Sequence, residues 1–342
     1  MTPQTIEPAW QLSVEGYPRA LSASADSRWL AVGLDDGHVQ LIRSDTANMD
    51  QRVRVHDAAI TALAWNPRTP LLASGGEDGA VRVHNLAQGG HKDVVPPGDL
   101  WAQQVAWNPK GSKLAWSVGR KSSIHSVDGR GDQDLPEVES TVAGLTWAPD
   151  GETVAVACYG GVRLFDPKSG RRTRKLDWKG SMINLALSPN GKVIACGCQD
   201  NSVHFWRLST GRDSMMSGYP LKPSTIAWSH DSSMLATGGG KEITVWEFSG
   251  KGPEGSAPLV LEGHQNPVTH VAFSPLVKVL ASGDRDGQIL IWFPDDANTP
   301  VRRHSLSARI EALAWVPDVD SASLRLVACD AEGNVAAWPL QA

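Results

Sequence analysis

The chain has 342 residues, of which 41% are hydrophobic and 20% are charged, and its formal net charge is −5. This balance excludes a disordered chain, because the apolar residues suffice for a sizeable core. Because acidic and basic residues are interspersed, it also argues against a general binder of nucleic acids or anionic membranes. The 33 glycines and 22 prolines indicate many turns and therefore many short strands.

The N-terminal residues 1–14 lack the basic start, apolar core and small-residue cleavage site of a secretion signal. No stretch approaches 18 consecutive apolar residues, so we expect a soluble, cytoplasmic protein without a membrane partner. Reduced thiols fit the four cysteines, which lie in strand-like segments: Cys158, Cys196, Cys198 and Cys329.

One pattern recurs along the whole chain. In each copy an apolar residue precedes a pair of small and aromatic residues, and this anchor recurs at intervals of 42, 42, 40, 40, 41, 45 and 42 residues. The eight anchors are Leu21, Leu63, Val105, Leu145, Leu185, Ile226, Val271 and Leu313. A period of about 40–45 residues is typical of the blades of a β-propeller.

Each copy predicts four strands. The first run, such as residues 62–67, is almost continuously apolar, as expected of a strand buried on both faces. The second run, such as residues 71–75, ends in small residues, and the third follows a tight turn such as Asp286-Gly287. The fourth run, such as residues 52–56, is polar, which favours an exposed edge. Four such strands and their turns account for one period.

Seven polar fourth runs connect the eight copies, so the last copy lacks one. The N-terminal run over residues 9–17 precedes the first copy, while the last copy stops at Trp338. We therefore expect the N-terminal run to complete the last blade and leave no long open sheet edge. The prediction is one all-β domain over residues 1–342, an eight-bladed β-propeller of four-stranded antiparallel blades. The alternative is seven blades, with one degenerate copy as an appendage.

The pattern resembles the WD40-repeat β-propeller family over essentially the whole chain, and residues 261–293 carry most of its marks. In that family a buried network links the His of a Gly-His pair, a Ser or Thr, a turn Asp and a Trp. The resemblance implies that His264, Ser282, Asp286 and Trp292 form this network. Such a network satisfies polar groups that burial would otherwise penalise.

Other copies keep fewer of these marks. The second copy has His56, Ser74 and Asp78, but His84 stands at the position of the Trp. The sixth copy has a shorter turn that lacks the Asp. We therefore expect most blades to be held together by burial of apolar side chains.

No motif in the chain points to catalysis, because a nucleophile elbow and a Gly-rich phosphate loop are both missing from the sequence. Cys196 and Cys198 share one side of a strand, and Cys158 occupies the equivalent column one copy earlier, but a metal site needs further convergent ligands. We predict no catalytic residues, no cofactor and no metal. One column of aromatic residues recurs at the blade period and is predicted to be core: Trp65, Trp107, Trp147, Trp228 and Trp315.

The family presents its loops around one mouth of a central channel, and binding residues concentrate on loops that a rigid scaffold positions. The columns that would surround this mouth contain charged and aromatic residues of the kind that anchor interfaces. They are Arg19, Glu77, Trp101, Gln103, Tyr159, Lys222, Arg285, Arg309 and Glu311.

The first hypothesis is a monomeric, non-enzymatic scaffold that binds a protein or peptide on one face, and neither nucleic acid nor membrane. The alternative is a propeller, with or without enzymatic activity, that binds a small molecule or metal at the channel mouth. Mixed charge with exposed aromatics favours the first, whereas catalysis would call for clustered carboxylates or histidines. Fold resemblance alone does not identify the partner.

Overall fold

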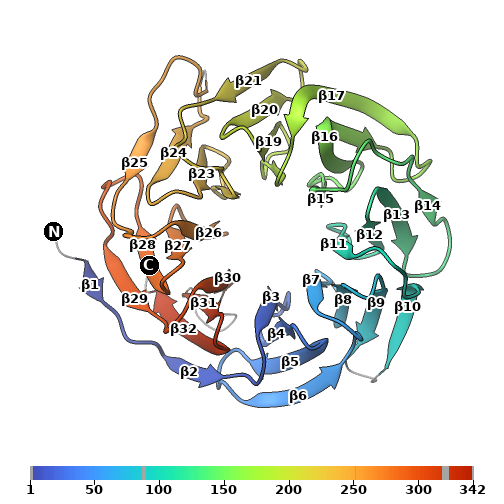
Figure 1. Ribbon diagram of the computed structural model, residues 1–342, viewed down its shortest axis with the longest axis horizontal. Helices are drawn as coiled ribbons and strands as arrows, with labels where there is room; N and C mark the ends of the chain where they lie inside the picture. The colour runs from blue at the N-terminus through green and yellow to red at the C-terminus, as the bar shows by residue number, and fades with distance from the viewer. Residues whose placement is uncertain (1–2, 87–89, 251, 318–322, 341–342) are drawn as a thin grey trace. The chain divides into compact units, whose positions relative to one another are not determined.

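The computed structural model describes residues 3–86, 90–250, 252–317 and 323–340. The chain divides into two compact units: unit 1 comprises Met1–Glu15 and Ala186–Ala342, and unit 2 comprises Gly16–Leu185. Every regular element of the described residues is a β-strand, and each unit contains four sheets (Figure 1). Within a sheet, consecutive strands pair antiparallel, and two short N-terminal strands are added to two of the sheets of unit 1. We number the sheets 1 to 8 in chain order.

Unit 2 contains sheets 1 to 4. Sheet 1 consists of β3 (Pro18–Ala23), β4 (Trp29–Leu34), β5 (His38–Arg43) and β6 (Met49–Arg54). Sheet 2 consists of β7 (Ile60–Trp65), β8 (Leu71–Gly76), β9 (Val81–Asn85) and β10 (His91–Val95). Sheet 3 consists of β11 (Ala102–Trp107), β12 (Lys113–Val118), β13 (Lys121–Ser126) and β14 (Gln133–Asp134). Sheet 4 consists of β15 (Gly144–Trp147), β16 (Val154–Phe165) and β17 (Arg172–Ser181).

The long strand β16 takes the place of two strands of the repeat. Its first half pairs with β15 and its second half pairs with β17. Between the halves lie Gly160 and Gly161, whose φ angles of 90° and 112° are available to glycine at little cost. The two arms of β16 therefore correspond to the second and third runs of the repeat.

Unit 1 contains sheets 5 to 8. Sheet 5 consists of β18 (Ala186–Leu187), β19 (Val193–Gly197), β20 (Val203–Arg207) and β21 (Asp213–Met216). Sheet 6 consists of β22 (Thr225–Trp228), β23 (Met234–Gly238), β24 (Ile243–Glu247) and β25 (Leu259–Leu261). Sheet 7 consists of β26 (Val268–Phe273), β27 (Leu280–Asp284), β28 (Gln288–Trp292), β29 (Arg302–Ser305) and β1 (Gln4–Thr5). Sheet 8 consists of β30 (Ile310–Pro317), β31 (Leu324–Asp330), β32 (Asn334–Leu340) and β2 (Trp10–Ser13).

The N-terminal segment supplies the missing strand of sheet 8. Strand β2 pairs antiparallel with β32, with Trp10 opposite Ala337 and Ser13 opposite Asn334. The predicted completion of the last blade by the N-terminal run is therefore confirmed. The two-residue strand β1, which pairs in parallel with β29, is an addition that the repeat pattern did not predict.

The eight sheets confirm the predicted all-β, eight-bladed β-propeller class, and the alternative of seven blades is wrong. Every copy of the repeat, including the degenerate copies near Ala20 and Gln104, forms a sheet of its own. The organisation of residues 1–342 as a single domain stays a prediction.

Burial follows the expected order within a sheet. The second strands are buried, as in β4, where Leu30, Ala31 and Val32 have no exposed surface. The fourth strands are polar, and every residue of β6 is exposed. Apolar side chains are thus removed from water at the second strand while charged ones stay solvated at the fourth.

First strands of successive sheets pack side by side, β3 with β7 and β7 with β11 in unit 2, and β22 with β26 and β26 with β30 in unit 1. Each Trp of the recurring column donates its indole N–H to a backbone carbonyl of the preceding sheet, at 2.9–3.2 Å. Four of the five are buried as predicted: Trp107, Trp147, Trp228 and Trp315. Trp65 also packs against a hydrophobic core cluster, but it is only half-buried and lines a pocket.

Candidate functional site

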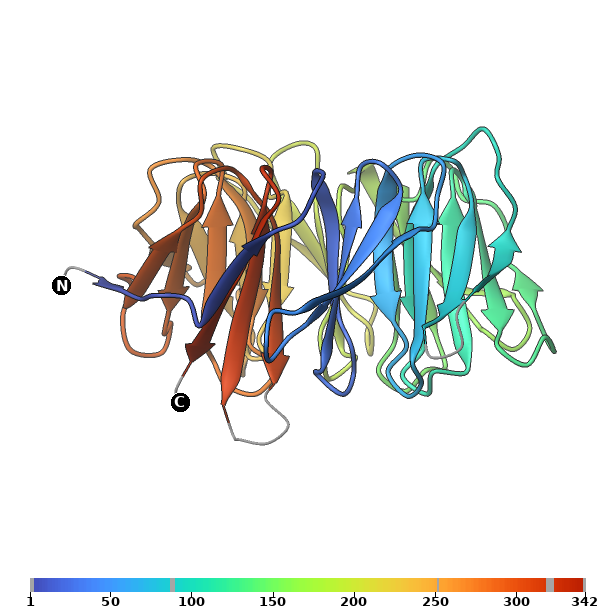
Figure 2. The same cartoon turned by 90° about the horizontal axis from the view of Figure 1, so that it is seen from below.

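The antiparallel strands give each sheet two ends. We call the end at which the first strand begins the entry end, and the opposite end the exit end. The turns from second to third strand and the connections from fourth strand to the next sheet lie at the entry end (Figure 2). All nine residues predicted to bind a partner lie in these segments or at the start of a first strand.

In unit 2 the structure brings Arg19 and Glu77 together. The guanidinium Nη2 of Arg19 lies 3.7 Å from Oε1 of Glu77, and the two side chains are 41% and 26% exposed. The Arg19 guanidinium also lies 6.0 Å from the ring centroid of Tyr17. An ion pair this exposed contributes little to stability, so its charges remain open to a partner.

Trp101 is the most prominent predicted residue at the entry end of sheet 3. Its side chain is 50% exposed, and the preceding Leu100, which the sequence analysis did not select, is 58% exposed. Leu100 lines a pocket of about 680 Å³ together with Pro96, Trp116 and Glu137. The sequence signal for this exposed apolar surface was the adjacent pair Leu100 and Trp101, because two large apolar residues outside a predicted strand are not expected to be buried in the core.

Gln103 lies two residues further along, at the start of β11, and is half-buried. Its side-chain Oε1 is buried and accepts no hydrogen bond from the described residues. Because this oxygen is buried, it is not accessible to a partner, and leaving it unpaired is costly.

Tyr159 is 50% exposed and lies beside an ion pair between a buried arginine and an exposed glutamate, which the sequence analysis missed. Arg163 is 1% exposed, and its Nη2 and Nε donate to Oε1 and Oε2 of Glu139 at 2.8 and 3.1 Å. The Arg163 guanidinium lowers the pKa of Glu139 to about 2. The only sign of this ion pair in the sequence was a single arginine, Arg163, within the apolar run that ends at Phe165.

In unit 1 the structure brings Arg309 and Glu311 together, with Arg309 Nε 3.3 Å from Glu311 Oε1. The side chain of Arg309 is 52% exposed, whereas that of Glu311 is 11% exposed. Lys222 and Arg285 are both exposed at the entry ends of sheets 6 and 7.

The polar network of sheet 7 differs in one member from the set that the resemblance implied. His264 Nδ1 lies 2.8 Å from Oδ2 of Asp284, and its Nε2 lies 2.7 Å from Oγ of Ser282. Trp292 donates its indole N–H to the same Oγ at 2.8 Å. The assignment of Asp286 was wrong, because Asp286 is exposed and accepts a hydrogen bond from Asn266 instead.

Asp284 also holds the turn that follows β27. Its Oδ1 accepts hydrogen bonds from the backbone N–H of Asp286 at 3.0 Å and of Gln288 at 2.9 Å. The carboxylate is 1% exposed, so all its charge is balanced by these donors and by His264. The residue between, Arg285, is thereby held at the surface.

Sheet 2 builds the same network from different positions. His56 Nδ1 lies 2.9 Å from Oδ1 of Asp78 and His56 Nε2 lies 2.8 Å from Oγ of Ser74. His84 Nε2 takes the place of the indole, 2.8 Å from the same Oγ. Arg82 adds an ion pair, its Nη1 3.1 Å from Oδ2 of Asp78.

Glycine at position 76 allows this change. In the alignment of the two turns Gly76 occupies the position of Asp284, and Asp78 occupies that of Asp286. A Cβ at Gly76 would collide with His56 Nδ1 and with Asp78 Oδ1. The side chain of Asp284 fills this space in sheet 7. In sheet 2 the same space is filled by the side chain of Asp78, which lies two residues further along the turn.

Burial determines the protonation of the sheet 2 histidines and of the cysteines. Desolvation lowers the pKa of His84 from 6.5 to about 3 and also lowers the pKa of His56. All four cysteines are buried thiols, and desolvation raises the pKa of Cys198 to about 11. A buried thiol with a raised pKa is a poor nucleophile and a poor metal ligand.

Within the described ranges, no three His, Cys, Asp or Glu side chains are close enough together to hold a metal ion. Over the same residues, the search for a helix of the length and hydropathy needed to span a bilayer found none.

Comparison with known proteins matches four segments to the family described as WD domain, G-beta repeat: residues 49–85, 172–207, 217–247 and 255–292. The first match begins in the fourth strand of sheet 1 and ends in the third strand of sheet 2. The sequence repeat is thus offset from the sheet by one strand, which explains why the N-terminal strand must complete the last sheet.

Curated relatives are similar over much of this chain. Protein HIR1 of Mycosarcoma maydis is 26% identical over 332 residues, which are 89% of this chain and 32% of that protein. THO complex subunit 3 of Arabidopsis thaliana is 26% identical over 220 residues, 61% of this chain and 66% of that protein. This chain therefore spans about one third of the first relative and just under two thirds of the second.

Among solved structures, the computationally designed Ika8 protein matches with a TM-score of 0.78 and 19% sequence identity. The match covers 96% of this chain and 98% of that chain. At this level of identity the likeness supports the fold only.

Proposed function

We propose that this chain, which is a WD40-repeat β-propeller, is a non-enzymatic scaffold that binds a protein or peptide partner through its entry-end residues. Proteins built on this repeat are generally protein-interaction scaffolds, and most are not enzymes. The name of one relative, THO complex subunit 3, places that protein in a complex. We extend the same type of role, assembly with other proteins, to this chain.

The observation that carries the proposal is the exposure of large apolar side chains at the entry end of unit 2. Leu100, Trp101 and Tyr159 are each at least half exposed, although removing such side chains from water is favourable. Aromatic side chains beside charged groups are the composition of interface hot spots, and here Arg19 and Glu77 supply such charges. A partner that covers these side chains would remove their apolar surface from water.

Two features keep the entry-end residues in place. Glu77 lies next to Asp78, and Arg285 lies next to Asp284, so each of these binding candidates sits on a turn that a buried polar network fixes. A preformed surface loses less conformational entropy on binding than a mobile one. A location in the cytoplasm and a monomeric state are part of this proposal.

Cross-linking from the native cell tests which end of the sheets binds. Entry-end segments contain the exposed lysines Lys121, Lys222 and Lys241, and exit-end turns contain the matched set Lys110, Lys168 and Lys192. With a lysine-reactive cross-linker and mass spectrometry, we expect links to partner proteins to concentrate on the entry-end set. Links distributed equally over both sets, or concentrated on the exit-end set, would contradict the proposal.

A further inference from the structure

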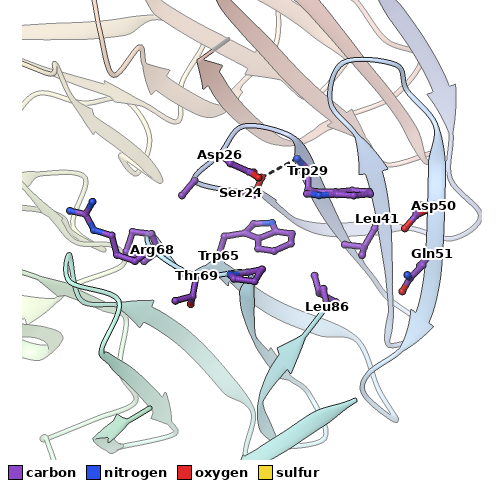
Figure 3. Close-up of a pocket in the computed structure, with 13 residues that line it drawn as sticks. Ser24, Asp26, Trp29, Leu41, Asp50, Gln51, Trp65, Arg68, Thr69 and Leu86 are labelled. Atoms are coloured by element: carbon purple, nitrogen blue, oxygen red, sulfur yellow. Dashed lines mark hydrogen bonds between the residues drawn. The ribbon is translucent and has the colours of Figure 1, made fainter. Parts of the chain in front are cut away.

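The exit end of unit 2 contains a pocket that the proposed function does not use. It has a volume of about 640 Å³ and lies between sheet 1 and sheet 2 (Figure 3). Its apolar wall combines two tryptophans with aliphatic and proline side chains: Trp29, Leu41, Trp65, Pro67, Pro70 and Leu86. This volume lies within the range of about 300–1,000 Å³ that is typical of ligand pockets.

The equivalent space between sheets 5 and 6 of unit 1 is filled. There Phe205 occupies the position of Leu41, and Phe248 that of Leu86. The ring of Phe248 packs edge-on against Phe205 and Trp228, at centroid distances of 5.1 and 4.6 Å. Trp228 is buried, whereas its counterpart Trp65 is half-buried. The pocket therefore arises because leucines replace two phenylalanines.

The polar groups of the pocket have an unbalanced charge. Asp50 lies on β6, is exposed and forms no hydrogen bond or ion pair with the described residues. Asp26 uses Oδ1 to accept hydrogen bonds from the Ser24 hydroxyl and from the Arg28 N–H, which leaves its Oδ2 open. Three carboxylates, those of Asp26, Asp45 and Asp50, act on the single guanidinium of Arg43, so negative charge exceeds positive charge in this part of the pocket.

Nearby cations are already engaged. Arg43 forms a two-point ion pair with Asp45, through Nη2 at 3.0 Å and Nε at 3.3 Å, and its guanidinium lies 5.0 Å from the Trp29 ring centroid. Arg68 donates from Nε to the backbone carbonyl of Pro109 at 3.4 Å, and Figure 3 shows it at the opposite end of the pocket from Asp50. A ligand that complements the pocket therefore brings positive charge as well as apolar surface.

Gln51 and Thr69 favour a peptide as the source of that charge. The Gln51 amide and the Thr69 hydroxyl both line the pocket, and neither side chain hydrogen-bonds to another described residue. Such groups can bond the N–H and C=O of an extended backbone, while pockets for alternate side chains give specificity. We propose that this exit-end pocket binds a peptide segment in which a bulky apolar residue lies next to lysine or arginine.

The test uses the whole chain labelled with 5-fluorotryptophan and ¹⁹F NMR. The signals of Trp29 and Trp65 are assigned from the variants Trp29→Phe and Trp65→Phe. The probes are blocked seven-residue peptides of Gly and Ser with a central Phe-Lys-Lys, Phe-Glu-Glu or Ala-Lys-Lys. We expect Phe-Lys-Lys to shift both signals saturably, and the other two to bind at least about fivefold more weakly, because each loses one of the two complementary features.

Two variants probe the pocket itself. Asp26→Asn with Asp50→Asn should weaken Phe-Lys-Lys binding at least about fivefold, whereas the exposed turn variant Asp128→Asn should leave it unchanged. Asparagine keeps the Oδ1 acceptor of residue 26, so the turn it holds should persist. Leu41→Phe with Leu86→Phe, which copies sheets 5 and 6, should abolish the shifts without lowering the melting temperature.

Three outcomes would overturn the inference. They are no shift at millimolar peptide, equal binding of all three peptides, and shifts that persist after the two leucines are replaced. Benzylamine is the small-molecule control, and binding of benzylamine as tight as that of Phe-Lys-Lys would assign the pocket to free organic amines instead. Because the pocket lies at the exit end, each of these results is independent of partner binding at the entry end.

Discussion

Sheets 2 and 7 reach the same buried network by different routes. In sheet 7 the carboxylate comes from Asp284 and the ring nitrogen from Trp292. In sheet 2 the carboxylate comes from Asp78 and the ring nitrogen from His84. The carboxylate has moved by two positions in the turn, and glycine at position 76 makes the exchange possible. The two sheets thus share a chain of hydrogen bonds that is built from residues at different positions.

Sheets 4, 6 and 8 extend the comparison. In sheet 6 the hydroxyl of Tyr219 accepts the indole N–H of Trp246 at 2.8 Å. In sheet 8 the buried Asp330 accepts hydrogen bonds from the backbone of Ser307 and Ala308, with no histidine in between. Sheet 4 uses the ion pair of Arg163 with Glu139. Sheets 4, 6 and 8 therefore each tie the entry-end connection to the strands with a polar group of a different kind.

The largest expected effect comes from removing the sheet 7 carboxylate. Asp284→Ala leaves His264 and two turn N–H groups without an acceptor in a buried site, and we expect the free energy of unfolding to fall by roughly 2–4 kcal/mol. Asp286→Ala is the matched control, for which we expect less than about 1 kcal/mol because its carboxylate is exposed. Denaturant titration measures both, and a larger loss for Asp286→Ala would contradict the assignment.

Moving the carboxylate of sheet 2 to the sheet 7 position tests the exchange itself. Gly76→Asp alone should destabilise by roughly 1–3 kcal/mol, because the new side chain collides with His56 and Asp78. Asp78→Ala alone should cost about as much, because the buried His56 loses its carboxylate partner and the buried Arg82 keeps only Asp93.

Combining Gly76→Asp with Asp78→Ala restores one carboxylate to the network, so we expect the double variant to be more stable than either single variant. The coupling is read from a double-mutant cycle of unfolding free energies. Simple additivity of the two losses would show that position 76 cannot substitute for position 78.

The smallest effect on stability at pH 7 is expected at His84, which contributes mainly a pH dependence at lower pH. Its pKa falls from 6.5 to about 3 on folding, so between these values the unfolded chain binds more protons than the folded chain. Stability should therefore rise from about pH 3 to about pH 6.5 and level off above. His84→Phe should flatten this rise while losing about 1 kcal/mol at pH 7 from the broken hydrogen bond to Ser74. An unchanged pH slope in this variant would show that His84 titrates normally.

The fold could be predicted because the eight copies share a period and because each copy shows the same succession of buried apolar runs and an exposed polar run. The strand β2 was predictable for the same reason, since a polar run was missing after Trp338 and present before Leu21. The parallel strand β1 was not, because two residues carry no periodic signal.

The site was predictable in position but not in detail. Spacing cannot tell which carboxylate of the turn, Asp284 or Asp286, points inward, because both residues fit a tight turn equally well. The half-burial of Trp65 depends on the volumes of Leu41 and Leu86, which come from neighbouring sheets and are distant in sequence. The pair Glu139 and Arg163 joins a loop to a strand 24 residues later, and no repeat marks it.

The most direct test of the central claim, that entry-end side chains bind the partner, is quantitative affinity purification with the double variant Trp101→Ala and Arg285→Ala. The matched control is Leu276→Ala with Arg130→Ala, which also removes one exposed apolar residue and one arginine, both from exit-end turns. We predict that the first variant loses at least about 90% of partner recovery, because hot-spot side chains each contribute roughly 2 kcal/mol or more. We also predict that the control recovers partners normally and that both variants melt as the unaltered protein does. Full partner recovery by a correctly folded Trp101→Ala, Arg285→Ala variant would contradict the claim.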